Sequence, residues 1–195
     1  MLVVVASRYD EIARSLVDCW AKQGAKLLTC DDLSVVGWRH SLRGVGGDSS
    51  PLLDSTAVVD GQVVGVEEIS GVLIRLPYVF EQELLHIVPD DRAYVAAEMQ
   101  AFLISWLSRL KCPVLNRPTP SYLLGANWRP QQWVYAAAQV GIPVRPVHCF
   151  EVNPAPGFSY YQQATGQPIS SAIAILLAGG GNCTSVEADF HKTYA

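Results

Sequence analysis

The stretch LVVVASRYDEIARSLVDCW, residues 2–20, decides the fold of this chain. Residues 2–6 form a continuous apolar run rich in β-branched side chains, which is typical of a strand buried on both faces of a parallel sheet. Residues 7–10 supply turn and capping side chains, and apolar residues then recur at helical spacing from Ile12 to Trp20. The stretch therefore predicts a buried strand followed directly by an amphipathic helix.

The next residues complete a β-α-β unit. Gly24 is placed to end the helix, and residues 26–30 (KLLTC) read as a second strand that ends at Asp31 and Asp32. The crossover between two such parallel strands is expected to be right-handed. Residues 56–60 and 62–66 then flank Asp60-Gly61, the strongest short signal for a β-hairpin in the chain.

Later segments return to the parallel pattern. Residues 76–89, with Pro77 and Pro89, are expected to be irregular. The long helix that follows has an apolar stripe at helical spacing. The expected elements are a strand over 71–75 (GVLIR), a helix capped by Asp90 or Asp91, a strand over 112–115, a helix over 129–140 and a strand over 144–150.

This order predicts an α/β fold: a small, doubly wound, mostly parallel sheet with an inserted β-hairpin. Residues 1–150 are expected to form one domain. Residues 151–195, rich in Gly, Pro, Ser and Gln, are expected to be a linker or tail that has at most one or two short elements and adds little to the core.

Composition narrows the class of protein. Of 195 residues, 50% are hydrophobic and 16% are charged, which indicates a packed globule rather than a disordered chain. A net charge of −4 gives no reason to expect nucleic acid or an anionic membrane as a partner. No signal-peptide pattern opens the chain, and the five cysteines are widely spaced without a CxxC pair, so free thiols and a cytoplasmic location are expected.

Candidate site residues follow from the sheet itself. Ligands of open parallel sheets bind beyond the carboxyl ends of the strands. The side chains expected at that edge are Arg8 after the first strand, Asp31 after the second, Arg75 at the end of GVLIR, and Asn116 and Arg117 after the strand over 112–115. Arg75 and Arg117 would converge there, and a guanidinium fork suits a carboxylate or phosphate.

A structural reading of these arginines stays open. Each arginine could instead pair with a nearby acid, such as Asp31 or Glu98, or cap a helix C-terminus. Likewise, the aromatic cluster of Trp128, Trp133 and Tyr135 could pack its helix on a neighbour or serve as a platform for adenine.

Several common motifs are absent from the sequence. Neither GxGxxG nor GxxxxGK[ST] occurs, and the glycines of residues 44–47 do not lie between a strand and a helix. The four histidines show no metal-ligand spacing, so no metal site is expected. His148 and Cys149 are neighbours on an expected strand and would point to opposite faces, which disfavours a catalytic pair.

Three segments taken together resemble a known family. They are similar in order and spacing to the N-terminal domain of ATP-grasp ligases of the RimK-like and graspetide type. The segments are GVLIRLPYV (71–79), DDRAYVAAEMQAFLISWLSRLKCPVLNRP (90–118) and NWRPQQWVYAAAQVGIPV (127–144). The resemblance implies a Rossmann-like, pre-ATP-grasp domain that helps to position substrate. It marks Arg75, Asn116 and Arg117 as edge residues and places Glu98 on a helix beside them.

The chain also departs from that family. Residues 127–130 (NWRP) have no lysine where the family usually has one, and residues 151–195 do not supply the family's ATP-binding lysine or its acidic and Asn magnesium ligands. Phosphoryl transfer needs such a metal clamp. The chain alone is therefore expected to bind no cofactor and to perform no ligation, with ATP and magnesium involved only if an ATP-grasp domain lies elsewhere.

Three functions remain as expectations. The first is a substrate-positioning domain of a carboxylate–amine ligase, partnered by an ATP-grasp domain beyond residue 195 or on another subunit. The second is a standalone binding or assembly subunit, including a homodimer, that docks through the region of Trp128 to Tyr135. The third is a small enzyme that acts on an anionic metabolite through Arg75 and Arg117. The expected ligand is a small anionic substrate or a peptide.

Overall fold

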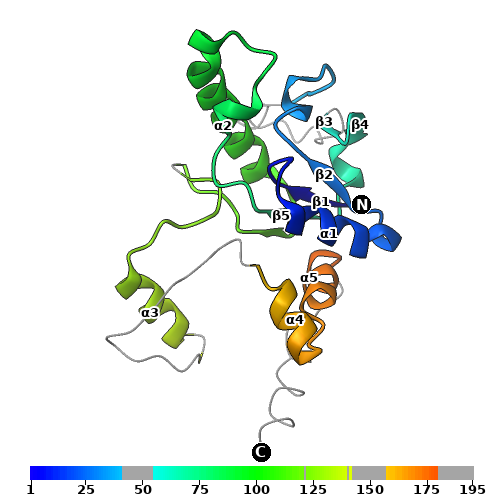
Figure 1. Cartoon of the computed structure of the whole chain (residues 1–195), viewed down its shortest axis with the longest axis vertical. Helices are drawn as coiled ribbons and strands as arrows, with labels where there is room; N and C mark the ends of the chain where they lie inside the picture. The colour runs from blue at the N-terminus through cyan, green and yellow to red at the C-terminus, as the bar shows by residue number, and fades with distance from the viewer. Residues whose placement is uncertain (41–54, 121, 140, 142–156, 180–195) are drawn as a thin grey trace, which may run out of the picture.

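A four-stranded parallel sheet forms the centre of the computed structural model, which describes residues 1–40, 55–120, 122–139, 141 and 157–179 (Figure 1). The strand order is β2-β1-β5-β6, and every neighbouring pair is parallel. The bounds are Leu2–Val5 for β1, Lys26–Leu28 for β2, Gly71–Ile74 for β5 and Val114–Leu115 for β6. The predicted parallel core is confirmed.

The central strand β1 explains why its sequence is apolar throughout. Val3 and Val5 belong to one hydrophobic core, with residues of α2 (Arg92–Arg109), whereas Leu2 and Val4 belong to the other, with residues of α1 (Glu11–Cys19). Alternate strand residues point to opposite faces, so a strand covered on both faces needs apolar residues at every position. Helices lie on both sides of the sheet, which confirms the doubly wound class (Figure 1).

The predicted hairpin is also present, as a separate antiparallel pair. β3 (Thr56–Val59) and β4 (Gln62–Gly65) pair in register around Asp60 and Gly61. Asp60 has φ 54° and Gly61 has φ 70°. Two successive positive φ values define the turn that matches the twist of a two-residue hairpin, and Asp-Gly is among the few dipeptides that adopt it readily.

Part of the segment after residue 150 belongs to the core. It contains α4 (Ser159–Thr165) and α5 (Ile169–Leu177) among the described residues, and Ala174 and Leu177 of α5 are buried in the same core as α1. The Trp20 Nε1 donates a 2.9 Å hydrogen bond to the Ser170 carbonyl. The expectation that this segment adds little to the core is therefore wrong for α5. α1 has only nine residues and leaves part of this face of the sheet for α5 to cover.

Short 3-10 turns connect the main elements: Ala21–Gln23, Asp32–Ser34, Val66–Glu68, Glu81–Glu83 and Pro89–Asp91. The expected helix near 129–140 is α3 (Pro130–Gln139), which stands apart from the sheet (Figure 1). The loop over 43–51 and the expected strand over 144–150, with its His148-Cys149 pair, lie outside the described residues. Across the ranges that are described, every helix is too short or too polar to cross a bilayer.

Candidate functional site at the carboxyl edge of the sheet

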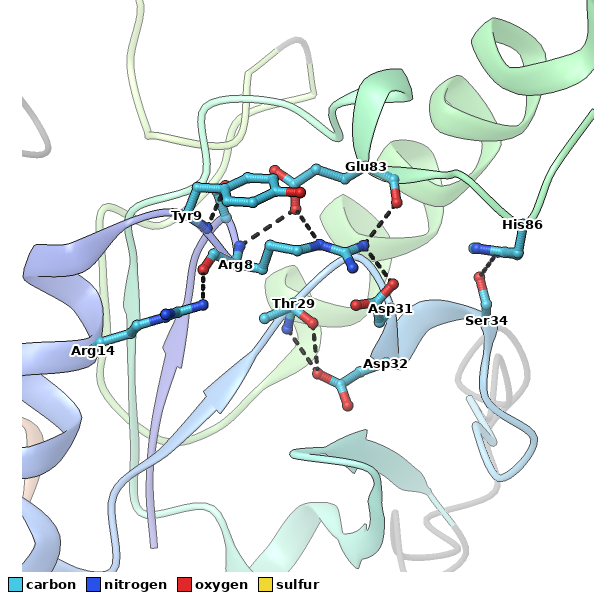
Figure 2. Close-up of polar contacts among 10 residues, drawn as sticks. Arg8, Tyr9, Arg14, Thr29, Asp31, Asp32, Ser34, Glu83 and His86 are labelled. Carbon is cyan, nitrogen blue, oxygen red and sulfur yellow. Dashed lines mark hydrogen bonds and ion pairs between the residues drawn. The ribbon is translucent and has the colours of Figure 1, made fainter. Parts of the chain in front are cut away.

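Arg8 is the centre of the polar contacts at this edge (Figure 2). It follows β1, and its Nη2 donates to Asp31 Oδ1 at 2.5 Å and to the Glu83 carbonyl at 2.7 Å. Its backbone N–H donates to Glu83 Oε2 at 3.3 Å, and its Nε lies 3.6 Å from the same oxygen. One arginine thus joins the loops that follow β1, β2 and β5.

Exposure separates the two carboxylates around Arg8. The Glu83 side chain is 4% exposed and the Asp31 side chain is 49% exposed, while that of Arg8 is 26% exposed. Burial opposes the charge of Arg8, but the carboxylates of Asp31 and Glu83 together raise the pKa of Arg8 above its ordinary value. Arg8 and Asp31 therefore present a charged pair to solvent, anchored from beneath by Glu83.

Cys30 lies next to Asp31 in the chain, and its thiol is unreactive. It is fully buried at the end of the strand region that leads to Asp31. Burial, together with the negative charge of Glu83, raises the pKa of Cys30 to about 11. A thiol with such a pKa is almost entirely protonated at neutral pH, so Cys30 is a packing residue rather than a nucleophile.

Arg75 points toward α1. Its Nε donates to Asp10 Oδ2 at 2.9 Å, and the Arg75 side chain is only 5% exposed. The other oxygen of Asp10 accepts the backbone N–H of Ala13 at 2.9 Å, which caps the start of α1. An anion at a helix N-terminus is favoured by the helix dipole, and here that anion is the protein's own carboxylate.

Asn116 and Arg117 do not join Arg75. Asn116 has φ 58° and turns the chain just after β6, and its Nδ2 donates to the Ile74 carbonyl at 2.8 Å. Because of this turn, the Arg117 guanidinium reaches back to carbonyls at the end of α2 and before β6. Its contacts, all between 3.2 and 3.4 Å, are the carbonyls of Leu107, Ser108, Leu110 and Cys112.

The predicted convergence of Arg75 and Arg117 on one anion is therefore not what the structure shows. Arg75 pairs with an acid and Arg117 caps a helix C-terminus, the two structural readings that the sequence left open. Arg8 and Asp31 are brought together, whereas Glu98 is exposed on α2. Any role of these residues in binding a substrate stays a prediction.

Two residues that matter at this edge were not among the candidates. Asp10 reads as a helix cap in sequence, but its pairing with Arg75 depends on how β1 and β5 lie side by side. Glu83 comes from the segment 76–89, which has no periodic signal. The irregular sequence gives no indication that one of its acids would be buried against Arg8.

The neighbouring aspartate, Asp32, is structural. Its Oδ2 accepts the backbone N–H of Thr29 at 2.8 Å, and its Oδ1 accepts the backbone N–H of Gly61 at 2.8 Å. It thereby fastens the hairpin turn to the end of β2. Nearby, Ser34 Oγ and His86 Nε2 are hydrogen-bonded at 2.7 Å, which links the loop after β2 to the connection between β5 and α2 (Figure 2).

The polar groups at this edge contact other groups of the chain itself. The start of α1, where phosphate would be expected, is capped by Asp10, and the arginines at hand already bind protein oxygens. Across the described ranges, His, Cys, Asp and Glu side chains form no group of three that could hold a metal ion.

A second surface lies on α3. None of the described side chains of this helix is buried, and Trp128 and Tyr135 are 43% and 67% exposed. The Trp128 and Trp133 rings lie 4.8 Å apart. A shallow hollow of about 580 Å³ is lined by Trp128, Gln131, Gln132, Tyr135, Ala136 and Gln139. The hollow holds no charged side chain, so it suits an uncharged partner surface.

Comparison with known proteins gives structural similarities only. No family model matches the chain, and no curated protein matches its sequence. One similar structure is the macrocyclase MdnC bound with precursor peptide MdnA from Microcystis aeruginosa MRC, at TM-score 0.40 and 15% identity, covering 59% of this chain and 37% of that one. Another is a RiPP-associated ATP-grasp ligase from Chryseobacterium gregarium in complex with ADP and a leader and core peptide, at TM-score 0.40 and 14% identity, covering 72% of this chain and 39% of that one.

The chain thus spans less than two fifths of the length of either ligase. It is similar in structure to part of these RiPP-associated ATP-grasp ligases, the class of enzyme that the three sequence segments resemble.

Proposed function

We propose that this chain is a substrate-positioning domain that works against an ATP-grasp-type catalytic unit in a carboxylate–amine ligation. The observation that carries the proposal is the uncovered α3. It lies in the segment 127–144 that resembles the ligase family. Tyr135 of this helix and Trp128 just before it are exposed around an uncharged hollow. Exposed aromatic clusters of this kind are typical of surfaces that another protein covers.

The contacts at the carboxyl edge of the sheet indicate which role belongs to this domain and which to the catalytic unit. Arg8, Arg75 and Arg117 are held by carboxylates and carbonyls of the chain itself. ATP and its magnesium would then be held by the catalytic unit, on the same polypeptide or on another one. What this domain offers is the half-exposed pair of Arg8 and Asp31, which can orient a small anionic substrate or a peptide.

Photo-crosslinking from α3 tests the docking surface. A photoreactive phenylalanine analogue at Tyr135 would be introduced into the chain in its source organism, with the same substitution at Tyr94 as control. The two tyrosines are 67% and 68% exposed, on different helices. We expect a crosslink from position 135, and not from 94, to a protein or segment with an ATP-grasp domain. Crosslinks to a second copy of the chain alone would favour the assembly subunit instead.

The edge is tested separately by ligand binding. Thermal shift with amino acids and short acidic peptides should reveal a stabilising ligand, since a ligand that binds the folded state raises its melting temperature. Arg8→Gln should abolish the shift in melting temperature. Asp31→Asn should enlarge the shift for an acidic ligand, because it removes a negative charge beside Arg8 on a side chain that is 49% exposed. Identical shifts in both variants and in the parent chain would exclude this pair as the binding site.

A further inference from the structure

A hollow of about 440 Å³, here called the α2 hollow, lies between α2 and the chain segment that follows β5. Its floor is the helix, where Ala93, Ala97 and Ala101 recur every four residues and are exposed. Residues spaced by four lie one above the other on a helix, so these small side chains leave space along α2. The wall of the α2 hollow is formed by residues 78–82.

Contacts on its inner side hold this wall in place. Val79 is buried, and its backbone N–H donates to Oε1 of Gln100, on α2, at 3.4 Å. Glu83, at the end of the same segment, is also buried, whereas Glu81 and Gln82 are exposed. The wall is therefore tied to the helix and the core, and its polar side chains face solvent.

The side chains of the wall favour a cationic ligand. Tyr78 is 50% exposed, and its ring lies 4.4 Å from the ring of Phe80, which packs against the core. Among the described residues that line the α2 hollow, Glu81 is the one charged side chain, and it accepts a 3.4 Å hydrogen bond from the Gln82 amide. An aromatic face beside a carboxylate suits a guanidinium, which stacks on the ring and pairs with the acid.

The charge of the surrounding segment agrees with this chemistry. Residues 76–104, which form both wall and floor, have one arginine and five carboxylates: Glu81, Glu83, Asp90, Asp91 and Glu98. Their net charge of −4 equals that of the whole chain, so the rest of the sequence is neutral overall. Arg92 is held by the Ile87 carbonyl, to which its Nε donates at 2.9 Å. Such a field attracts a cationic ligand and repels an anionic one.

The length of the α2 hollow suits a short extended peptide. From Ala93 to Ile104, both of which line it, the helix rises about 16 Å, at about 1.5 Å per residue. An extended peptide advances about 3.3 Å per residue, so about five residues span this distance.

We infer that the α2 hollow binds an extended peptide segment through an arginine side chain, whose guanidinium stacks on Tyr78 and pairs with Glu81. The alanine floor receives the aliphatic part of that side chain and the peptide residues beside it. The described lining residues of this site include neither the Arg8–Asp31 pair nor any residue of α3. The inference therefore goes beyond the proposed function, and either one can fail without the other.

An NMR titration of the full chain tests this site. The probes are the capped pentapeptide Gly-Ala-Arg-Ala-Gly and the same peptide with citrulline, which keeps the shape of arginine without its charge. We expect the arginine peptide to shift the amide signals of residues 78–82 and 93–104. It should bind at least about fivefold more tightly than the citrulline peptide, the order of one exposed ion pair with a stacked ring. Equal binding of both peptides, shifts confined to other residues, or no saturable shift would overturn the inference.

Two matched pairs of variants at exposed positions locate the site. Glu81→Gln should weaken binding of the arginine peptide at least about threefold, as the loss of an exposed ion pair does. Glu98→Gln removes the same charge from α2 outside the lining and should leave binding unchanged. Ala97→Leu should fill the α2 hollow and abolish binding, whereas Ala172→Leu on α5 should not. Equal effects within either pair would show that the peptide is not bound in the α2 hollow.

Discussion

At the scale of single residues, two adjacent aspartates show how differently identical side chains are used. Asp31 is half-exposed and pairs with Arg8, whereas Asp32 is 5% exposed and accepts hydrogen bonds from Thr29 and Gly61. Asp32→Ala leaves two backbone N–H donors without their acceptor, so we expect a loss of about 2–4 kcal/mol in the free energy of unfolding. Asp31→Ala should lose less than about 1 kcal/mol, as exposed ion pairs do. Urea denaturation of both variants measures the difference, and similar losses would contradict it.

The buried thiol of Cys30 gives a prediction about pH. Its pKa is raised to about 11, so the folded chain keeps this proton at pH values where an unfolded thiol has lost it. The unfolded state therefore binds fewer protons over this range, and this contribution to stability is lost as pH rises toward 11. At pH 8, iodoacetamide should label the exposed Cys19 and leave Cys30 unmodified. Peptide mass spectrometry reads both sites, and comparable labelling would be inconsistent with a buried Cys30.

The same scale shows what the sequence could predict about the site. The strand ends located Arg8, Asp31 and Arg75 at the carboxyl edge, because that depends only on where apolar runs stop. The sequence did not predict which group each guanidinium would contact. Arg117 turns back to the end of α2 because Asn116 adopts a left-handed backbone conformation, φ 58°, which the sequence alone does not dictate.

At the scale of elements, strands and the hairpin were the most predictable parts. Continuous apolar runs mark strands buried on both faces, and Asp60-Gly61 marks its turn directly. α5 was not expected to join the core because its apolar run is short and interrupted by Ser170 and Ser171, with no side-chain cap at its start. Whether such a helix covers a sheet is decided by the uncovered area of that sheet, which is a property of the folded chain.

Docking of α5 depends on a glycine in β5. A Cβ built on Gly71 would lie 2.4 Å from the backbone oxygen of Leu177, so Gly71→Ala forces α5 away from the sheet. We expect a loss of about 1–3 kcal/mol in the free energy of unfolding and faster hydrogen exchange in residues 169–177. The control is Gly65→Ala in β4, where the nearest atoms belong to the flexible Glu67 side chain. If α5 were a detached tail, both variants would behave alike.

At the scale of the whole molecule, the two faces of the sheet explain its organisation. One face is closed by α2 and the other by α1 and α5. None of the described side chains of α3 is buried. The doubly wound class followed from the order of strands and helices in the sequence. The separation of α3 from the sheet did not, because half-apolar sequences such as PQQWVYAAAQ suit both a covered helix and a docking surface.

The last prediction concerns the whole chain and ATP. The start of α1 is capped by Asp10, Arg8 lies between two carboxylates, and the chain carries a net charge of −4, so a highly anionic nucleotide meets repulsion at this edge. We expect MgATP at about 5 mM to shift the melting temperature by less than about 1 °C, because a ligand that does not bind the folded state cannot stabilise it. Differential scanning fluorimetry checks this, with MgCl₂ alone as the control for the metal. A saturable shift specific to ATP would place a nucleotide site in the chain itself and would argue that catalysis need not be supplied by a separate unit.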